Sequence, residues 1–301
     1  MKHLLKMSDL SKEDIISILN LADQLKYERN HNIPHKILEG KTLGMIFQKS
    51  STRTRVSFET GMYQLGGSAL FLSSNDLQIG RGEPVQDTAR VLSRYLDGIM
   101  IRTFEQKEVE DLAKYGSIPI INGLTDYAHP CQVLADLMTI REYKGALDNL
   151  KLCYIGDGNN MANSLIVGCL KAGMRVAIAC PKGYYPSSDV LEFAKTYGDK
   201  FELTNDPVKA AEGADAVYTD VWASMGQESE SAKRKQVFTG YQINAKVMSA
   251  SNKDAMVLHC LPAHRGEEIT EDVLEAHPEI FDEAENRLHA QKAVLVKLLK
   301  D

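Results

Sequence analysis

The stretch that decides the fold runs from Thr42 to Gly67 and reads TLGMIFQKSSTRTRVSFETGMYQLGG. Its first six residues are mostly apolar and predict a buried strand. A polar loop follows, and residues 54–65 predict a helix that ends at the Gly66-Gly67 pair. A strand, a loop and a helix in this order begin a βαβ unit, so the sequence predicts a parallel sheet.

The same alternation continues through two series of elements, separated at Gly145-Ala146-Leu147-Asp148. The further strands that we expect cover residues 69–72, 98–102, 118–121, 152–155, 175–179, 201–203, 216–219 and 256–259. The helices that we expect include one starting at Ser11 and others over 86–96, 107–115, 129–143 and 283–299. This pattern predicts an α/β protein with two doubly wound parallel-sheet domains joined by helices. We expect the domains to be residues 1–145 and 146–282, with the last helix, 283–301, packed back on the first.

Composition limits the class of protein. A length of 301 residues suits two domains, and 44% hydrophobic with 25% charged residues is typical of a globular protein. The net charge of -6 argues against a nucleic-acid partner. Five cysteines without a CxxC pair indicate reduced thiols. We find no signal peptide and no apolar run near 18 residues, so we expect a cytoplasmic location and no membrane partner.

The loop Ser50-Ser51-Thr52-Arg53-Thr54-Arg55 lies between a predicted strand and the start of a predicted helix. Free backbone N–H groups and the helix dipole favour an anion there, and guanidinium groups match phosphate oxygens. The alternative is an ordinary Ser/Thr helix cap with two solvated arginines. A P-loop ending in Gly40-Lys41-Thr42 fails, because His35 replaces its first glycine and a strand follows. We expect a phosphate site at residues 50–55.

The segment Ser51-Thr52-Arg53-Thr54-Arg55 resembles the carbamoyl phosphate signature of the aspartate and ornithine carbamoyltransferases. Further segments match the family in order and spacing, namely Gln78, Arg102 and His129-Pro130-Cys131-Gln132. The resemblance implies that Arg53 and the loop with Ser51 and Thr52 hold the phosphate. It also implies that Arg102, Thr54 and His129 polarise the carbamoyl oxygen, that Gln132 orients the carbamoyl nitrogen, and that Arg287 in the last helix is a further contact. Fixed donors and cations of this kind stabilise the charge that develops during acyl transfer.

The second half of the chain contains Ile155-Gly156-Asp157-Gly158-Asn159-Asn160-Met161 after a strand. A dinucleotide-binding turn is the lesser interpretation, because Met161 replaces the third glycine and no acidic residue follows about 20 positions later. The turn resembles the ornithine site of the family, where Asn160 would contact the amino acid's main-chain end. Asp220 is our candidate partner for the ammonium group. Ser224-Met225 resembles the loop that distinguishes ornithine from aspartate as substrate.

The segment His259-Cys260-Leu261-Pro262, with His264 nearby, could suggest a metal site. Adjacent residues on a strand point in opposite directions and no cysteine pair completes a tetrahedral site, so we expect no metal. By resemblance, Cys260 lies beside the attacking amine, and the carbonyls of Cys260 and Leu261 accept from the carbamoyl nitrogen. An inert buried thiol is the alternative for Cys260. The cationic run Lys233-Arg234-Lys235 is expected to form a solvated helix face.

The resemblance as a whole implies an enzyme of arginine metabolism with no cofactor. Its catalytic residues would be Arg102, His129 and Cys260, and its substrates carbamoyl phosphate and L-ornithine, with L-citrulline and phosphate as products. A homotrimer is also implied, with Gln78 reaching into a neighbouring site. Three alternatives remain open: a carbamoyltransferase that uses aspartate or a diamine, a nicotinamide oxidoreductase, and a non-catalytic binding protein. The direction of the reaction in the cell also remains open.

Overall fold

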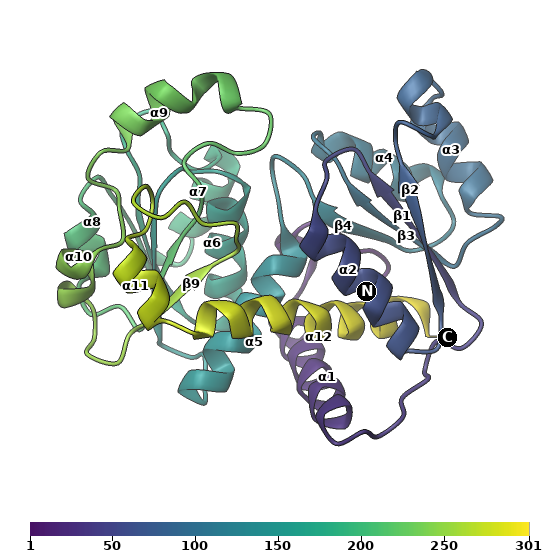
Figure 1. Ribbon diagram of the computed structural model, residues 1–301, viewed down its shortest axis with the longest axis horizontal. Helices are drawn as coiled ribbons and strands as arrows, with labels where there is room; N and C mark the ends of the chain where they lie inside the picture. Colours follow the sequence, from purple (N-terminus) through teal and green to yellow (C-terminus); the bar gives the residue numbers. More distant parts are fainter. Residues whose placement is uncertain (301) are drawn as a thin grey trace. The chain divides into compact units, whose positions relative to one another are not determined.

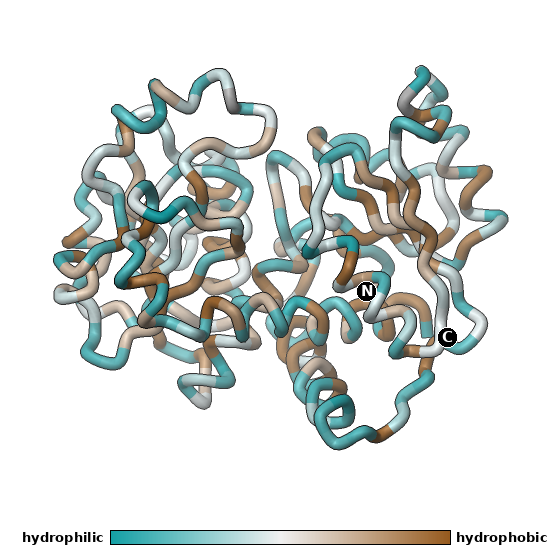
Figure 2. The backbone as a smooth tube through the Cα atoms, in the orientation of Figure 1, coloured by the Kyte–Doolittle hydropathy of each residue, from teal (hydrophilic) through white to brown (hydrophobic). Residues whose placement is uncertain are grey.

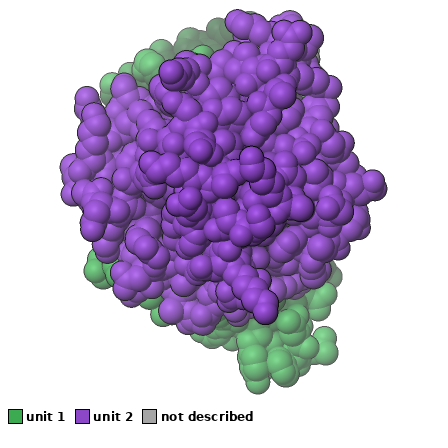
Figure 3. Space-filling model, turned by 90° about the vertical axis from the view of Figure 1, so that its left-hand side faces the viewer, with its two compact units in different colours: residues 1–138, 286–301 green, residues 139–285 purple. Residues whose placement is uncertain are grey.

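The computed structural model describes residues 1–300, apart from the side-chain surroundings of residues 80 and 228. Residue 301, the predicted end of the last helix, lies outside the described residues. The chain divides into two compact units, which Figure 3 colours separately. Unit 1 comprises residues 1–138 and 286–301, and unit 2 comprises residues 139–285. Both boundaries fall inside helices, α5 (Pro130–Lys144) and α12 (Glu279–Leu299).

Unit 1 contains a four-stranded parallel sheet in the order β2-β1-β3-β4. Its elements before α5 are η1 (Met7–Asp9), α1 (Lys12–Asn30), β1 (Thr42–Phe47), α2 (Thr52–Gln64), β2 (Ser68–Ser73), η2 (Gln78–Arg81), α3 (Val85–Leu92), β3 (Gly98–Arg102), α4 (Gln106–Tyr115) and β4 (Ile120–Leu124). Ile46, Ile99 and Ile101 pack with Val109 and Leu112 of α4 in one core cluster. The sheet is therefore held by apolar side chains from its central strands.

Unit 2 contains a five-stranded parallel sheet in the order β7-β6-β5-β8-β9. Its elements between α5 and α12 are β5 (Lys151–Ile155), α6 (Asn160–Ala172), β6 (Arg175–Ala179), α7 (Ser188–Lys195), η3 (Gly198–Lys200), β7 (Phe201–Thr204), α8 (Pro207–Ala211), β8 (Ala216–Thr219), η4 (Glu228–Glu230), α9 (Ser231–Val237), α10 (Ala245–Ala250), β9 (Met256–His259) and α11 (Glu271–Ala276). Figure 1 shows α8 and α10 on the opposite side of this sheet from α6 and α7.

In each sheet the chain reverses the direction in which it adds strands. In unit 1 it moves outward from β1 to β2 and then returns to add β3 and β4 on the other side. In unit 2 the corresponding switch lies between β5 and β8. Helices then leave the carboxyl ends of the two switch strands on opposite faces of the sheet, which opens a crevice where ligands bind in such folds. The prediction of two doubly wound parallel sheets is confirmed.

The burial of the strands explains their composition. Every residue of β3, β8 and β9 is buried, as expected where helices cover both faces of a parallel sheet. Figure 2 shows β3, labelled in Figure 1, among the apolar parts of the chain. The edge strand β2 differs, because Leu70 and Phe71 are 47% and 38% exposed. No helix among residues 1–300 is long and apolar enough to cross a membrane.

Several predicted boundaries were wrong, including the end of α3, which is Leu92 and not residue 96. Three of the differences have a local reason. α2 begins at Thr52 and not at residue 54, because Ser51 is the residue that caps it. β4 begins at Ile120 and not at 118, since Pro119 has no N–H to donate to a ladder. α12 begins at Glu279 and not at 283, since Pro278 directly before it favours a helix start.

The edge strand β9 is closed by two side chains of α12. Glu279 and Glu283 lie one helical turn apart, and their carboxylates accept the N–H groups of Val257 and His259, each at 2.9 Å. The hydroxyl of Tyr218 also donates to Glu283, at 3.3 Å. An edge strand would otherwise present these N–H groups without an acceptor. The two glutamates therefore satisfy buried backbone in place of a sixth strand in this sheet.

We predict that Glu283→Leu lowers the free energy of unfolding by about 2 kcal/mol, because it removes the acceptor of a buried N–H group. Thermal and urea unfolding of the purified variant would measure this. Glu285→Leu is the matched control, since Glu285 is exposed on the same helix. Equal unfolding free energies for the two variants would contradict the role of Glu283 as an edge cap.

Candidate active site

The loop after β1 forms the amino end of α2. Ser51 caps the helix, and its Oγ accepts the N–H of Thr54 at 3.2 Å. Thr54 is fully buried, and its Oγ1 lies 3.1 Å from Ser51 Oγ. Arg53 is half-buried, and its Nε is buried with no hydrogen-bond partner among the described residues. The helix start thus combines hydroxyl groups, the positive end of the dipole and a guanidinium group, which together favour an anion.

The two arginines of this segment face different ways. Arg55 lies two positions after Arg53, which is about 200° around a helix. Its Nε is 3.1 Å from Glu59, and its guanidinium group lies 3.8 Å from the centre of the Phe71 ring. The expectation that both arginines could hold the anion therefore applies to Arg53 only.

Arg287 of α12 joins the residues at the end of α2. Its Nη2 donates to Thr54 Oγ1 at 2.8 Å, and its side chain is buried. Burial lowers the pKa of His129 well below its usual value, and the charges of Arg287, Arg102 and Arg53 lower it further. The three arginines therefore lie close enough to His129 for their charges to act on it, and Arg287 also contacts Thr54. At neutral pH His129 is uncharged and can donate only one hydrogen bond.

Gln132 follows His129 at the start of α5, and both side chains are buried. The amide Nε2 of Gln132 donates to Asp136 Oδ1 at 2.8 Å. Asp136 is fully buried and lies one turn further along the helix. The sequence pattern pointed to Gln132 but not to Asp136.

Gln78 is not among the residues described in contact with this cluster. It is exposed and begins η2. The contacts described for residues 1–300 include none between Gln78 and the residues around Thr54. Thr52 is also exposed, although it lies beside Arg53.

Lys49 is a buried cation that the sequence analysis missed. Its side chain is 3% exposed, forms an ion pair with Asp126, and lies 4.3 Å from the centre of the Phe104 ring. Lys49 lies immediately before the loop of residues 50–55, and its ion pair with Asp126 joins the end of β1 to the segment that precedes His129. The available signal was its position at the end of a predicted strand.

In unit 2, polar residues gather at the carboxyl ends of the switch strands β5 and β8. Asn159 caps α6, and its Nδ2 donates to Asp220 Oδ2 at 2.8 Å. Asp220 also accepts the N–H of Val221 at 2.8 Å and the thiol of Cys260 at 3.1 Å. Asn160, at 8% exposed, is the first residue of α6. The structure thus places the side chains of Asp220 and Cys260 in direct contact.

A second network holds the backbone after β9. The N–H of Leu261 donates to His259 Nδ1 at 2.9 Å, so the other ring nitrogen, Nε2, carries the proton. That nitrogen lies 3.1 Å from the carboxylate of Glu268, which is fully buried. Leu261 has a φ of +56°, which is strained for a residue with a side chain. The side-chain atoms of Asp220, His259 and Cys260 that could ligate a metal ion lie within 4.8 Å of one another. Both ring nitrogens of His259, however, already have hydrogen-bond partners.

Arg234 holds the start of the loop that contains Ser224 and Met225. Its Nη1 donates to Asp157 at 2.7 Å and to the carbonyl of Trp222 at 2.9 Å. Burial raises the pKa of Asp157, and Arg234 opposes that rise. Ser224 is half-buried and Met225 is 43% exposed.

The prediction that Lys233, Arg234 and Lys235 form a solvated face was wrong for Arg234, which is 6% exposed. The reason is that a helix points consecutive residues about 100° apart, so one residue of three can face inward. Lys235 keeps to the expected pattern, with a side chain that is 52% exposed.

The glycine turn after β5 has little room for a dinucleotide. The N–H of Gly158 donates to the carbonyl of Tyr184 at 2.9 Å. A Cβ on Gly158 would lie 2.1 Å from the backbone carbon of Tyr185. Backbone of the same chain therefore takes the close approach that a pyrophosphate makes in nucleotide-binding folds.

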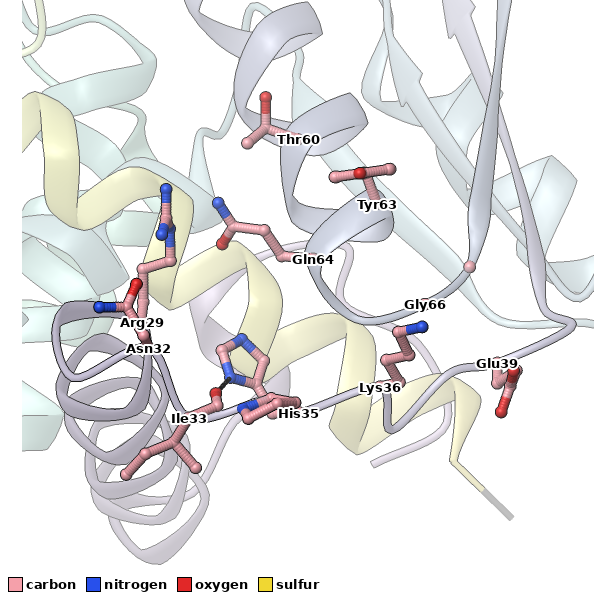
Figure 4. A pocket seen from close by; sticks show the side chains of 12 residues that line it. Arg29, Asn32, Ile33, His35, Lys36, Glu39, Thr60, Tyr63, Gln64 and Gly66 are labelled. Carbon is pink, nitrogen blue, oxygen red and sulfur yellow. Dashed lines mark hydrogen bonds between the residues drawn. The ribbon is translucent and has the colours of Figure 1, made fainter.

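A cavity of about 720 Å³ lies elsewhere in unit 1 (Figure 4). Seven residues between Arg29 and Glu39, the second half of α2, and Gly66 and Gly67 line it, and none of the predicted site residues does. Next to it, Lys292 donates to His35 Nε2 at 2.7 Å and to Gln64 at 2.9 Å. Burial lowers the pKa of Lys292 to about 8.

Comparison with protein families gives two matches that cover nearly the whole chain. The model described as "Aspartate/ornithine carbamoyltransferase, carbamoyl-P binding domain" matches residues 2–142. The model described as "Aspartate/ornithine carbamoyltransferase, Asp/Orn binding domain" matches residues 148–298.

Curated relatives and solved structures agree with these matches. An ornithine carbamoyltransferase of Carboxydothermus hydrogenoformans is 57% identical over 300 residues, which are 98% of this chain and 96% of the relative. One of Pyrococcus furiosus, named anabolic, is 52% identical over 99% of this chain and 96% of the relative. The crystal structure titled ornithine carbamoyltransferase from Pyrococcus furiosus has a TM-score of 0.94 at 53% identity, over 99% of this chain and 97% of that one. The anabolic enzyme of Campylobacter jejuni has a TM-score of 0.93 at 46% identity, over 99% of both chains.

We predict that Arg234→Met lowers the free energy of unfolding by about 3 to 5 kcal/mol, because it leaves the buried carboxylate of Asp157 without its cation. Urea unfolding followed by circular dichroism would measure the loss. Lys235→Met, next along the same helix, should cost less than about 1 kcal/mol. The double variant Asp157→Asn/Arg234→Met should regain part of the loss, and an unchanged stability in Arg234→Met would contradict the prediction.

Proposed function

The chain belongs to the aspartate/ornithine carbamoyltransferase family, and on this premise we propose that it transfers the carbamoyl group of carbamoyl phosphate to the side-chain amine of L-ornithine. The products are L-citrulline and phosphate. The observation that carries the proposal is the full-length similarity to ornithine carbamoyltransferases, at 57% identity in one case. The enzyme requires neither a cofactor nor a metal in this proposal, because the leaving phosphate and fixed cations supply the chemistry.

Residues 1–145 with the last helix form the carbamoyl phosphate domain in this proposal, and residues 146–282 form the ornithine domain. Arg53 and the loop of Ser51 and Thr52 hold the phosphate, and the unpartnered buried Nε of Arg53 supports this role. Arg102, His129 and Thr54 polarise the carbamoyl oxygen. A neutral His129 among three arginines suits that task, because it can donate a hydrogen bond without adding a fourth charge.

Four further residues complete the carbamoyl phosphate site that we propose. Arg287 contacts the substrate as well as Thr54, and Gln132 binds the carbamoyl nitrogen. The main-chain carbonyls of Cys260 and Leu261 accept from the same nitrogen. The hydrogen bond from Leu261 to His259 supports this role, because it holds that backbone in place.

Ornithine binds in this proposal through Asn160, Asp220, Ser224 and Met225. Asp220 pairs with the ammonium group. Its hydrogen bonds from Asn159 and Cys260 support the role, since they hold the carboxylate at one orientation.

The attacking amine must be neutral, which costs about 4.6 kcal/mol at pH 7 for an amine that titrates like lysine. We infer that desolvation beside Cys260 lowers this cost. The amine then attacks the carbamoyl carbon, the bond to phosphate breaks, and the departing phosphate takes the proton. Electrophile positioning by Arg102 and His129 lowers the barrier of the same step.

We also propose that the reaction runs toward citrulline in the cytoplasm, as a step of arginine biosynthesis. The names of the Pyrococcus furiosus and Campylobacter jejuni relatives, both called anabolic, support the direction. Five cysteines without a disulfide among the described residues support a reducing compartment.

A homotrimer with Gln78 contributed across the subunit interface completes the proposal. Gln78 is exposed, and no contact described for residues 1–300 joins it to the residues around Thr54. Unit 1 also exposes apolar side chains at positions close to Gln78 in the sequence, including Val56 at 55%, Tyr63 at 81% and Leu70 at 47%. Val56 and Tyr63 lie seven residues apart on α2, so they share one face of that helix, and contiguous exposed apolar surface is typical of sites that bind other proteins.

We predict that the purified protein forms citrulline from carbamoyl phosphate and L-ornithine, measured by a colorimetric citrulline assay. Aspartate and putrescine in place of ornithine should give little product. Asp220→Asn should raise the KM for ornithine by about tenfold or more, because it removes the charge that pairs with the ammonium group. A folded protein that forms no citrulline would refute the function, and a preference for aspartate or putrescine would refute the acceptor.

We predict that two inactive variants restore each other's activity when mixed as unfolded chains and refolded together. In a mixed trimer of Arg53→Met and Gln78→Ala subunits, one site receives a native Arg53 and a neighbour's native Gln78. Citrulline formation by the mixture, compared with each variant refolded alone, is the measurement. Failure to recover activity, with trimers confirmed by sedimentation, would place Gln78 in its own chain's site or outside any site.

A further inference from the structure

We propose that Asp136 makes the enzyme select carbamoyl phosphate over other acyl phosphates, by fixing which end of the Gln132 amide faces the substrate. This rests on the proposed function for the identity of the ligand. Asp136 is a positioning residue here, since it acts on the substrate only through Gln132. The carrying observation is the 2.8 Å hydrogen bond from Gln132 Nε2 to Asp136 Oδ1.

An amide side chain is nearly symmetric in shape, but its two ends have opposite hydrogen-bonding properties. The nitrogen only donates, and the oxygen only accepts. A glutamine without a fixed partner can turn either end toward a ligand. A carboxylate beside it removes this choice, because a carboxylate can accept from the nitrogen but cannot donate to the oxygen.

The geometry of α5 makes this constraint effective. Gln132 and Asp136 lie four residues apart, so they are neighbours on one face of the helix. Both side chains are fully buried, where a mismatched pair of polar atoms would cost far more than in water. With its nitrogen turned toward Asp136, the other end of the Gln132 amide is Oε1, an acceptor, and this is the end that can face a bound molecule.

That acceptor distinguishes between two similar donors. Carbamoyl phosphate carries an amino group on its carbonyl carbon, whereas acetyl phosphate carries a methyl group of similar size at that position. The amino group can donate to Oε1, and the methyl group would leave a buried oxygen unsatisfied. Sites built to bind a donor group reject analogues that lack it much more strongly than a simple difference in size would allow.

Stable analogues test this without turnover. Phosphonoacetamide and acetonylphosphonate share a phosphonate and a carbonyl group, and differ only in an amino group against a methyl group. We expect the wild-type protein to bind the amide more tightly, measured by isothermal titration calorimetry. In Asp136→Asn the neighbouring side chain can also donate, so Gln132 can turn, and the preference for the amide should fall roughly 10- to 100-fold.

Controls separate positioning from damage to the fold. Asp136→Glu retains a carboxylate and should keep a preference for the amide larger than that of Asp136→Asn. Inorganic phosphate should bind Asp136→Asn about as tightly as the wild type, because Arg53 is untouched. In a Gln132→Ala background, Asp136→Asn should change the preference no further, since the residue to be oriented is gone.

Two results would overturn the proposal. One is an unchanged preference in Asp136→Asn that still binds inorganic phosphate. The other, which applies even if Asp136→Asn does not fold, is an unchanged preference in Gln132→Met, which has no amide. The function is tested separately: a wild-type protein that prefers the amide but forms no citrulline would refute the proposed reaction and leave this inference standing.

Discussion

The reversal of strand order in each parallel sheet is the constraint on which the candidate site depends. Because β1 and β3 are switch neighbours, the loop that carries Arg53 and the strand end that carries Arg102 lie at the same edge of one sheet. The same relation between β5 and β8 brings Asn159 to Asp220. These residues are neighbours because parallel strands present all their carboxyl ends on one side of the sheet. The chemistry is therefore concentrated where the backbone already leaves unpaired N–H and C=O groups.

Charge burial is the main energetic cost of this arrangement. Burial and three arginines keep His129 neutral, and Asp157 is balanced by the single guanidinium group of Arg234. Pairs of this kind add little to stability, because desolvation offsets most of the attraction. What such pairs do is hold particular segments in place. Arg234 joins Asp157, in the turn after β5, to the carbonyl of Trp222, which lies next to the loop of Ser224. The buried apolar strands of the two sheets supply the free energy that offsets the cost of burying these charges.

Helix α12 contributes both to the stability of a sheet and to the candidate site. Its first turns close the edge strand β9 through Glu279 and Glu283 within unit 2. Its later turns supply Arg287 to Thr54 within unit 1. The apolar spacing of the helix predicted that it would pack, but the sequence could not indicate that its glutamates replace a missing neighbouring strand. That role depends on β9 being at an edge, which is a property of the whole sheet.

The sequence by itself determined the class of fold and most of the polar residues, because both follow from local order. Alternating apolar runs and helical patterns predicted the nine strands, the loop after the first strand predicted an anion site at Arg53, and a strand end made Asp220 a candidate, whereas Arg102 and His129 were implied by the resemblance to the carbamoyltransferases. The tertiary structure decided which of the charged residues face inward. Arg53 and Arg55 look alike in sequence, as do Arg234 and Lys235, yet Arg53 is half-buried and Arg234 buried, whereas Arg55 and Lys235 are exposed, because each helix turns successive residues to different sides. Asp136 became significant only through its contact with Gln132, because burial and hydrogen-bond geometry, and not residue type, give a carboxylate the power to orient its neighbour.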